Sequence, residues 1–251
     1  MQRHLIFQNS AERILPSETE AAEMHEIQIS GTDGTDLIVW AKDAPNLHAP
    51  ILLFFHGNAG TLGHRAPKFR WFIDQGYGVV ALAYRGSGGS DGSPSEHGHM
   101  QDAKALYAAL PRIFGRAIDP RKVVLYGESL GTGVAVGLAA NHSVGGVILE
   151  APYTSVDDVA QSMLPIFPIK PLNVIQHRFA SIDKIEHINA PLLILHGEKD
   201  RTIPIRLGKE LMQRANDPKW ARWYGEAGHN DLWEHGATNE VASFIDLYFK
   251  K

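Results

Sequence analysis

The sequence predicts an α/β fold built on a mostly parallel, doubly wound sheet. Short runs rich in Val, Ile and Leu recur along the chain, and runs that are apolar throughout are typical of parallel strands buried on both faces. Stretches long enough to form crossover helices separate several of these runs. We find no internal repeat and no linker, so residues 1–251 are interpreted as a single domain.

The first two strands differ from the later ones. Glu26–Ser30 alternates apolar and polar residues, and Leu37–Ala41 follows it across the turn signal Asp33-Gly34. The two segments predict an amino-terminal antiparallel hairpin of half-exposed strands. The later strands are expected, in chain order, at Ile51–Phe55, Val79–Tyr84, Val123–Tyr126, Gly146–Leu149, Leu192–Leu195 and Trp220–Tyr224. Helices are expected at Arg65–Gln75, Ser95–Phe114, Leu130–Asn141 and Asn239–Phe249.

One segment, at about residues 152–189, interrupts the alternation of strands and helices. Its prolines exclude a long helix or a central strand. Two interpretations remain open: the segment packs on the body of the protein, or it forms a small cap over an apolar pocket. Five large apolar side chains among the prolines favour neither one by themselves: Met163, Leu164, Ile166, Phe167 and Ile169.

Composition and charge exclude several classes of protein. The net charge of −4 argues against a nucleic-acid-binding protein, which would need a basic face. No apolar run reaches the roughly 18 residues of a membrane span, and the first ten residues lack the apolar core of a signal peptide. The absence of Cys excludes disulfides, thiol catalysis and iron–sulfur clusters. The hydrophobic content of 44% is enough for a sizeable core.

The most specific motif is Gly127-Glu128-Ser129-Leu130-Gly131. It directly follows one predicted strand and precedes a predicted helix. This is the context of a nucleophile elbow, in which a sharp strand-to-helix turn exposes the serine oxygen. Glycines two residues before and after the serine are needed, because a side chain there would strike the neighbouring strand or helix. The motif predicts that Ser129 is a nucleophile.

A serine nucleophile needs a base and a carboxylate that orients the base. Asp200 follows the predicted strand Leu192–Leu195, and His229 lies in the loop after the last predicted strand. Loops at the carboxyl ends of parallel strands face the same side, so we expect Ser129, Asp200 and His229 to converge, in the chain order known for this type of site. Glu198 remains the alternative carboxylate.

The chemistry also needs hydrogen-bond donors for the oxyanion. The N–H group of Leu130, next to the nucleophile, is one candidate, and the turn after Ile51–Phe55 offers a second from Asn58 or Ala59. We expect His56 to hold this turn from a partly buried position, outside the catalytic machinery. Five side chains are expected to contact the substrate: Tyr153, Met163, Leu164, Phe167 and Trp233.

Five ordered blocks extend this picture beyond the single motif: FFHGNAGTLGHR, YRGSGGSDGSPSEHG, LYGESLGTGVA, PLLILHGEKDRTIP and GHNDLW. With these blocks, the chain from about residue 51 onward resembles the α/β-hydrolase superfamily and, within it, the small ABHD-type serine hydrolases of the Bem46-like branch, some of which remove palmitoyl groups from proteins. The resemblance implies an α/β-hydrolase fold, a triad of Ser129, Asp200 and His229, and a structural role for Arg85. Family members often carry an amino-terminal membrane anchor. Residues 1–7 of this sequence do not have the pattern of such an anchor. We therefore expect a cytoplasmic protein, or a membrane-anchored one if such a segment has been trimmed.

We expect a serine hydrolase that cleaves carboxylic esters or thioesters through an acyl-enzyme, without a cofactor or metal. The expected substrate is a small acyl ester or thioester, with acyl groups of about C4–C8 because the cap is short, or else a lipidated protein. One alternative is a non-catalytic binding module of the same fold. Another is a dinucleotide-binding oxidoreductase, suggested by Gly131, Gly133 and Gly137 in front of Glu150.

Two histidines close together in the sequence raise the alternative of a metal site. His97-Gly98-His99 holds two potential ligands, but two histidines at this spacing need further ligands from elsewhere in the chain. A solvated helix start explains the same residues without a metal. The sequence therefore predicts no metal ligand.

Overall fold

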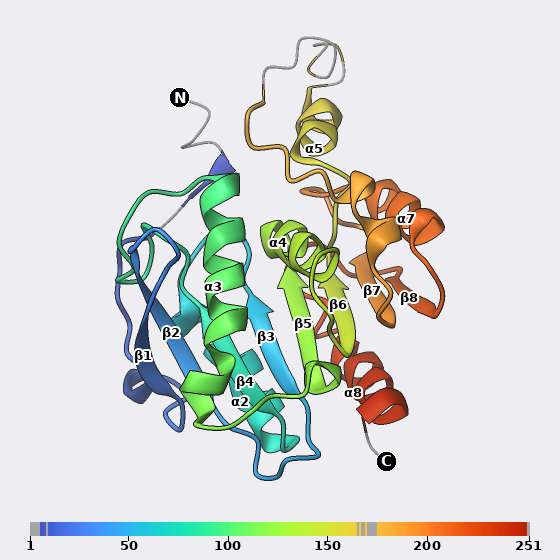
Figure 1. Cartoon of the computed structure of the whole chain (residues 1–251). Helices are drawn as coiled ribbons and strands as arrows, with labels where there is room; N and C mark the ends of the chain where they lie inside the picture. Colours follow the sequence, from blue (N-terminus) through green and yellow to red (C-terminus); the bar gives the residue numbers. More distant parts are fainter. Residues whose placement is uncertain (1–5, 9, 165, 167–168, 170–174, 250–251) are drawn as a thin grey trace.

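The computed structural model describes residues 6–8, 10–164, 166, 169 and 175–249. Eight strands form one sheet in the order β1-β2-β4-β3-β5-β6-β7-β8 (Figure 1). The pairs β1·β2 and β2·β4 are antiparallel, and every other pair is parallel. The bounds are β1 (His25–Ser30), β2 (Asp36–Lys42), β3 (Ile51–Phe55), β4 (Gly78–Leu82), β5 (Val123–Glu128), β6 (Gly146–Glu150), β7 (Leu192–Gly197) and β8 (Lys219–Tyr224).

Helices cover both faces of the sheet. The α-helices described are α2 (Ala66–Asp74), α3 (Glu96–Phe114), α4 (Leu130–Ala139), α5 (Val156–Met163), α7 (Ile205–Arg214) and α8 (Ala237–Phe249). Short 3₁₀ helices lie at η1 (Pro16–Glu18), η2 (Leu62–Arg65), η3 (Pro120–Lys122), η4 (Ser181–Asp183) and η5 (Ile185–His187). The predicted α/β class and doubly wound sheet are confirmed.

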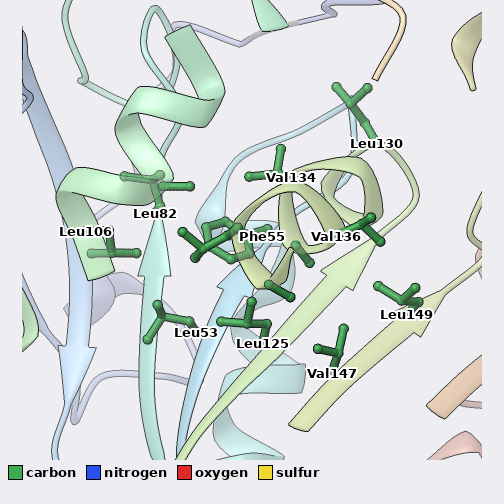
Figure 2. Close-up of a cluster of buried hydrophobic side chains, with 14 of the residues drawn as sticks. Leu53, Phe55, Leu82, Leu106, Leu125, Leu130, Val134, Val136, Val147 and Leu149 are labelled. Atoms are coloured by element: carbon green, nitrogen blue, oxygen red, sulfur yellow. The ribbon is translucent and has the colours of Figure 1, made fainter. Parts of the chain in front are cut away.

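Alternate residues of the central strands fill two separate cores. Leu53, Leu125 and Val147 point to one face, where they pack with Val134 and Val136 of α4 and Leu106 of α3 (Figure 2). Helix α7 covers β7 on the same face. Leu52 and Val124, which precede Leu53 and Leu125 in the sequence, point to the opposite face, which α2 and α8 cover. Both faces are buried, so the central strands carry the continuous apolar runs seen in the sequence.

The prediction for the amino-terminal hairpin is only half right. Strand β1 is half-exposed at the edge of the sheet, as expected. Strand β2, in contrast, is buried from Leu37 to Ala41. It lies between β1 and β4, and its Trp40 ring packs against Phe69 of α2. The expectation of half-exposure was wrong for β2 because Leu37–Ala41 is apolar throughout, which is the pattern of a strand covered on both faces.

The segment between β6 and β7 contains helix α5. Ser155 precedes this helix and its Oγ accepts a hydrogen bond from the N–H of Asp158 at 3.1 Å, which caps the helix. The helix ends at Met163, before the cluster of prolines begins, so the prolines did not prevent it. In Figure 1, α5 lies beyond the arrowheads of β5 and β6, at the carboxyl end of the sheet.

Helix α7 was not among the helices expected from the sequence. Its buried residues Leu207 and Leu211 are four positions apart, which is the spacing of one helix face. Arg85, for which the resemblance implies a structural role, bridges α3 and the hairpin turn: its Nε lies 2.9 Å from Asp102 and its Nη1 2.9 Å from Asp33. Across the described parts of the chain, none of the helices combines the length and apolarity that a bilayer crossing requires.

Candidate active site

The expected nucleophile lies on a strained turn between β5 and α4. Ser129 has φ 51° and ψ −117°, a conformation that non-glycine residues rarely adopt. Its N–H donates to the Glu150 carbonyl oxygen at 2.9 Å, which ties the turn to β6. A Cβ on Gly131 would lie 2.0 Å from the Phe55 carbonyl oxygen, and one on Gly127 2.7 Å from the Gly131 carbonyl oxygen. The motif therefore needs glycine at both positions.

The structure brings Ser129, His229 and Asp200 into one hydrogen-bonded chain. His229 Nε2 lies 3.0 Å from Ser129 Oγ, and His229 Nδ1 lies 2.7 Å from Asp200 Oδ2. The three residues follow β5, β8 and β7, whose carboxyl ends meet at the same edge of the sheet. Glu198, the alternative carboxylate, is exposed at the surface, whereas Asp200 is buried.

Asp200 is held so that one oxygen faces His229. Its Oδ1 accepts the N–H groups of Thr202 at 2.8 Å and Ile203 at 2.7 Å. Its Oδ2 contacts His229 and also lies 3.3 Å from Nε2 of His196, a ring that bonds the Ile203 carbonyl oxygen. Burial opposes ionisation of Asp200, but the hydrogen bonds from His196 and His229 outweigh it and hold the pKa of Asp200 below its usual range. Asp200 is therefore a carboxylate at neutral pH.

The candidate oxyanion donors lie beside the nucleophile. Leu130 is the first residue of α4, so its N–H group has no acceptor within the helix. The turn after β3 is close by: a Cβ on Gly57 would lie 3.4 Å from Ser129 Cβ. Asn58 and Ala59 line the same cavity as Ser129 and both remain candidates for the second donor. The Asn58 side chain is engaged elsewhere, because its Oδ1 accepts the Gln8 N–H at 2.8 Å.

A cavity of about 790 Å³ opens onto Ser129 and His229, within the usual size range of small-molecule sites. Of the expected substrate contacts, Tyr153, Met163 and Leu164 line it, and Phe167 lies outside the described residues. Much of the remaining lining is apolar as well, from the amino-terminal segment, α5, the segment that follows α5 and the loop after β7: Ile6, Val156, Val159, Ala160, Ile169, Ile175 and Ile203.

The prediction that Trp233 contacts the substrate is wrong, because Trp233 is not among the described residues that line this cavity. Its indole N–H donates to Tyr126 Oη at 3.2 Å and to Glu150 Oε2 at 3.1 Å, and its ring packs against Trp71 and Phe72. The short turn after His229 directs this side chain toward α2, away from the substrate side. Proximity to His229 in the sequence does not reveal that turn.

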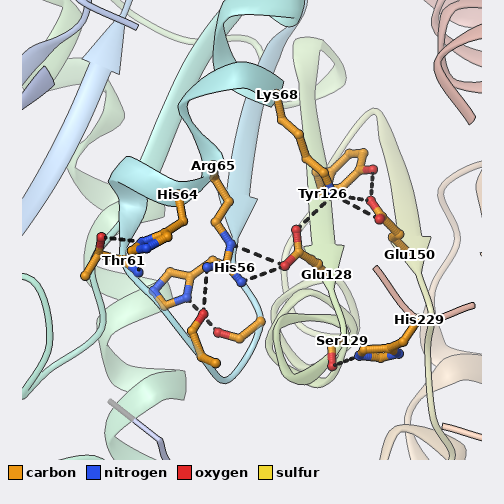
Figure 3. Close-up of polar contacts among 12 residues, drawn as sticks. His56, Thr61, His64, Arg65, Lys68, Tyr126, Glu128, Ser129, Glu150 and His229 are labelled. Atoms are coloured by element: carbon orange, nitrogen blue, oxygen red, sulfur yellow. Dashed lines mark hydrogen bonds and ion pairs between the residues drawn. The ribbon is translucent and has the colours of Figure 1, made fainter. Parts of the chain in front are cut away.

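An ion-pair network that the sequence analysis did not identify lies beneath the nucleophile (Figure 3). Glu128, the residue before Ser129, accepts from Arg65 Nη2 at 2.8 Å and from Lys68 Nζ at 2.9 Å. Lys68 also lies 2.8 Å from Glu150, which accepts a hydrogen bond from Tyr126. Burial opposes ionisation of Glu128, but Lys68 and Arg65 outweigh it and lower its pKa. No motif spacing signals this network, because its members come from separate elements.

Two histidines are more deeply buried than expected. His56 is 2% exposed instead of partly buried, although it does hold its own turn, with Nδ1 2.7 Å from the Gly57 carbonyl oxygen. His99 is completely buried, so the expected solvated helix start is wrong for this residue. Its ring stacks on Tyr84 at 4.2 Å between centroids and contacts Phe7 at 5.0 Å. Across the described residues, no cluster of three or more potential ligands could hold a metal.

These buried histidines predict acid lability. Burial lowers the pKa of His56 to about 4 and that of His99 to about 3, from the ordinary histidine value of 6.5. Below about pH 6.5 each histidine is protonated in the unfolded chain but stays neutral in the folded chain. The free energy of unfolding should therefore fall by up to about 1.4 kcal/mol for each histidine with every unit by which the pH is lowered. Urea titrations between pH 7 and 4 measure this slope.

The matched variants are His99→Phe, which keeps an aromatic ring in the stack, and the exposed control His97→Asn. His99→Phe should make the slope shallower, and His97→Asn should leave it unchanged. An unaltered slope in His99→Phe would show that His99 takes up its proton in the folded state.

The glycines that suggested a dinucleotide site serve helix packing. A Cβ on Gly133 would lie 2.4 Å from Tyr153 Oη, and one on Gly137 would lie 2.5 Å from Met100 Cε. With Gly131 against β3, these residues let α4 approach the sheet and α3 closely. They lie inside the helix, not in a turn that could receive a pyrophosphate.

A serine on this turn, bonded to a His–Asp pair at the edge of an eight-stranded sheet, defines a serine hydrolase of the α/β-hydrolase class. Residues 47–182 match the family model described as serine aminopeptidase, S33. The chain belongs to this family, and its relatives show it to be an ABHD-type α/β-hydrolase, as the resemblance implied.

Known proteins resemble the chain in sequence and in structure. It is 35% identical over 240 residues to the lysophosphatidylserine lipase ABHD12 of Danio rerio, covering 81% of this chain and 62% of that protein. An uncharacterized protein of Mycobacterium tuberculosis is 32% identical, covering 92% of this chain and 81% of that protein. The esterase Pf2001 of Pyrococcus furiosus superposes with a TM-score of 0.77 at 19% identity, covering 96% of this chain and 98% of that one, which supports the fold.

Proposed function

We propose that the protein hydrolyses carboxylic esters through an acyl-enzyme intermediate. One observation carries the proposal: His229 lies 3.0 Å from Ser129 Oγ through Nε2 and 2.7 Å from Asp200 through Nδ1. Each contact is within the range that proton transfer and orientation of the imidazole require. The intact set of three residues also argues against a non-catalytic binding module.

The geometry gives each residue a step in the reaction. Ser129 Oγ attacks the acyl carbonyl while His229 Nε2 takes its proton, and the Leu130 N–H stabilises the oxyanion. Asp200 stays ionised, holds the Nδ1 proton and stabilises the imidazolium that forms. His229 then protonates the leaving alcohol. The same histidine activates a water molecule that releases the acid and restores Ser129.

The lining of the cavity supports an ester with an apolar acyl group. The side chains of α5 and the loop after β7 offer mostly carbon to a bound chain, and each buried CH₂ adds about 0.8 kcal/mol of binding. Relatives that carry the name lysophosphatidylserine lipase also favour a lipid ester. A thioester or a lipidated protein would present the same acyl group with a different leaving group.

Removal of amino-terminal residues from peptides is a second candidate function, because the matching family model is described as a serine aminopeptidase. The lining of the cavity disfavours this function. A free amino terminus needs an unpaired carboxylate to receive it. Among the described residues of the cavity lining, Glu128 is the one carboxylate, and it is already paired with Arg65 and Lys68. We therefore propose an ester, not an amino-terminal peptide, as the substrate.

The experiment is a series of p-nitrophenyl esters from acetate to palmitate, assayed beside a palmitoyl thioester, a lysophospholipid and an amino-acid p-nitroanilide. We expect ester turnover to rise from acetate to the medium-chain esters and to be abolished in Ser129→Ala. Turnover of the anilide without turnover of any ester would contradict the proposal.

Leu164→Asp should change the preference for acyl length. Leu164 lines the cavity, so a carboxylate there would meet the end of a medium acyl chain but not an acetyl group. We expect kcat/KM for octanoate to fall about tenfold or more relative to acetate, the equivalent of a few buried CH₂ groups. The control is Ile166→Asp, an equal change at a side chain that is 97% exposed. Equal losses for both esters would show that Leu164 does not select the acyl group.

A further inference from the structure

Arg65 connects the two loops that carry the candidate oxyanion donors. Its Nη1 donates to the Ala59 carbonyl oxygen at 2.6 Å, in the turn after β3. Its Nη2 and Nε donate to Glu128 Oε1 at 2.8 Å and 3.3 Å, next to the nucleophile. One planar guanidinium thus bonds both sides of the space beside Ser129 (Figure 3).

The turn after β3 is shaped around this guanidinium. A Cβ on Gly60 would lie 2.7 Å from Arg65 Nη1, and a Cβ on Gly57 would lie 3.3 Å from Nη2. Gly60 also has φ 78°, which a side chain would strain. The two glycines therefore leave room for Arg65 within the same turn that holds Asn58 and Ala59.

The surroundings keep the guanidinium in one place. The Arg65 side chain is 13% exposed, and its partner Glu128 is held from the other side by Lys68 at 2.9 Å. Lys68 in turn is bonded to the buried Glu150. Two cations and two carboxylates balance in this network, so Arg65 has no excess charge with which to attract an anionic substrate.

We propose that Arg65 is a positioning residue that sets the distance between the two arms of the oxyanion hole, so that the N–H of Leu130 and the N–H of Asn58 or Ala59 meet the same oxygen. This role rests on the proposed ester hydrolysis. Lysine cannot replace arginine in it, because an ammonium is a point donor that cannot bond Ala59 and Glu128 in fixed directions.

Arg65→Lys tests the role, with Arg70→Lys as the matched control at an exposed ion pair on α2. We expect Arg65→Lys to lower kcat about 10- to 100-fold with KM within about twofold, because donors displaced by about 1 Å lose most of their effect in the transition state. The affinity for an alkyl trifluoromethyl ketone, whose adduct with Ser129 places an oxyanion in the hole, should fall by the same factor as kcat/KM.

Three results would overturn the role: an unchanged kcat, a loss confined to KM, which would make Arg65 a substrate contact, or a lower kcat with unchanged affinity for the ketone. If Arg65→Lys does not fold, Arg65→Ala with added methylguanidinium replaces it. Methylguanidinium should restore kcat and methylammonium should not, and equal effects of the two cations would contradict the role. A wild-type protein that hydrolyses no ester would instead refute the proposed function.

Discussion

Ser129→Ala should reduce kcat for the best ester by about 10³-fold or more, because the covalent step has no substitute nucleophile. The serine oxygen is the atom that His229 contacts at 3.0 Å, and the turn that holds it is strained. Alanine fits the same backbone, so the folded state should persist. Steady-state kinetics together with thermal unfolding separate the loss of chemistry from a loss of fold.

The control for this variant is Ser143→Ala, at an exposed serine between α4 and β6. It should retain wild-type kcat and KM. If Ser129→Ala kept more than a tenth of the wild-type rate in a purified, folded sample, Ser129 would not be the nucleophile.

Asp200→Asn should reduce kcat by about 10⁴-fold, by analogy with the effect of this change in other catalytic triads. The carboxylate accepts the Nδ1 proton of His229 at 2.7 Å, whereas an amide can present an N–H there. The imidazole would then carry its proton on Nε2 and could not take one from Ser129. A pH profile of kcat/KM, measured beside KM, distinguishes this loss from weaker binding.

Glu198→Gln is the paired variant, since Glu198 is the alternative carboxylate of the same loop. Its side chain is exposed, so the change should leave kcat near the wild-type value. Near-normal turnover in Asp200→Asn, combined with a large loss in Glu198→Gln, would reverse the assignment.

The positions of the central strands along the chain and the convergence of the triad residues could be predicted because both depend on local signals. Buried parallel strands carry continuous apolar runs, and the elbow requires glycine at 127 and 131 whatever the rest of the chain does. Asp200 and His229 follow strand ends, so the sheet itself brings them to the edge where Ser129 lies.

The missed features depend on where side chains point after folding. Trp233 is directed toward α2 by a turn, and His99 is buried because Phe7, from the start of the chain, packs over it. Arg65 gains its role from a carbonyl six residues away and a carboxylate 63 residues away. Periodicity and motif spacing carry no information on such contacts.

The most direct test of the account is to react the protein with an alkyl fluorophosphonate and to locate the adduct by peptide mass spectrometry. The account predicts one adduct per chain, on Ser129, with much slower labelling in His229→Ala because the serine then lacks its base. Labelling that is equally fast in Ser129→Ala, or no labelling of a folded wild-type protein, would contradict the assignment of Ser129 as the activated nucleophile.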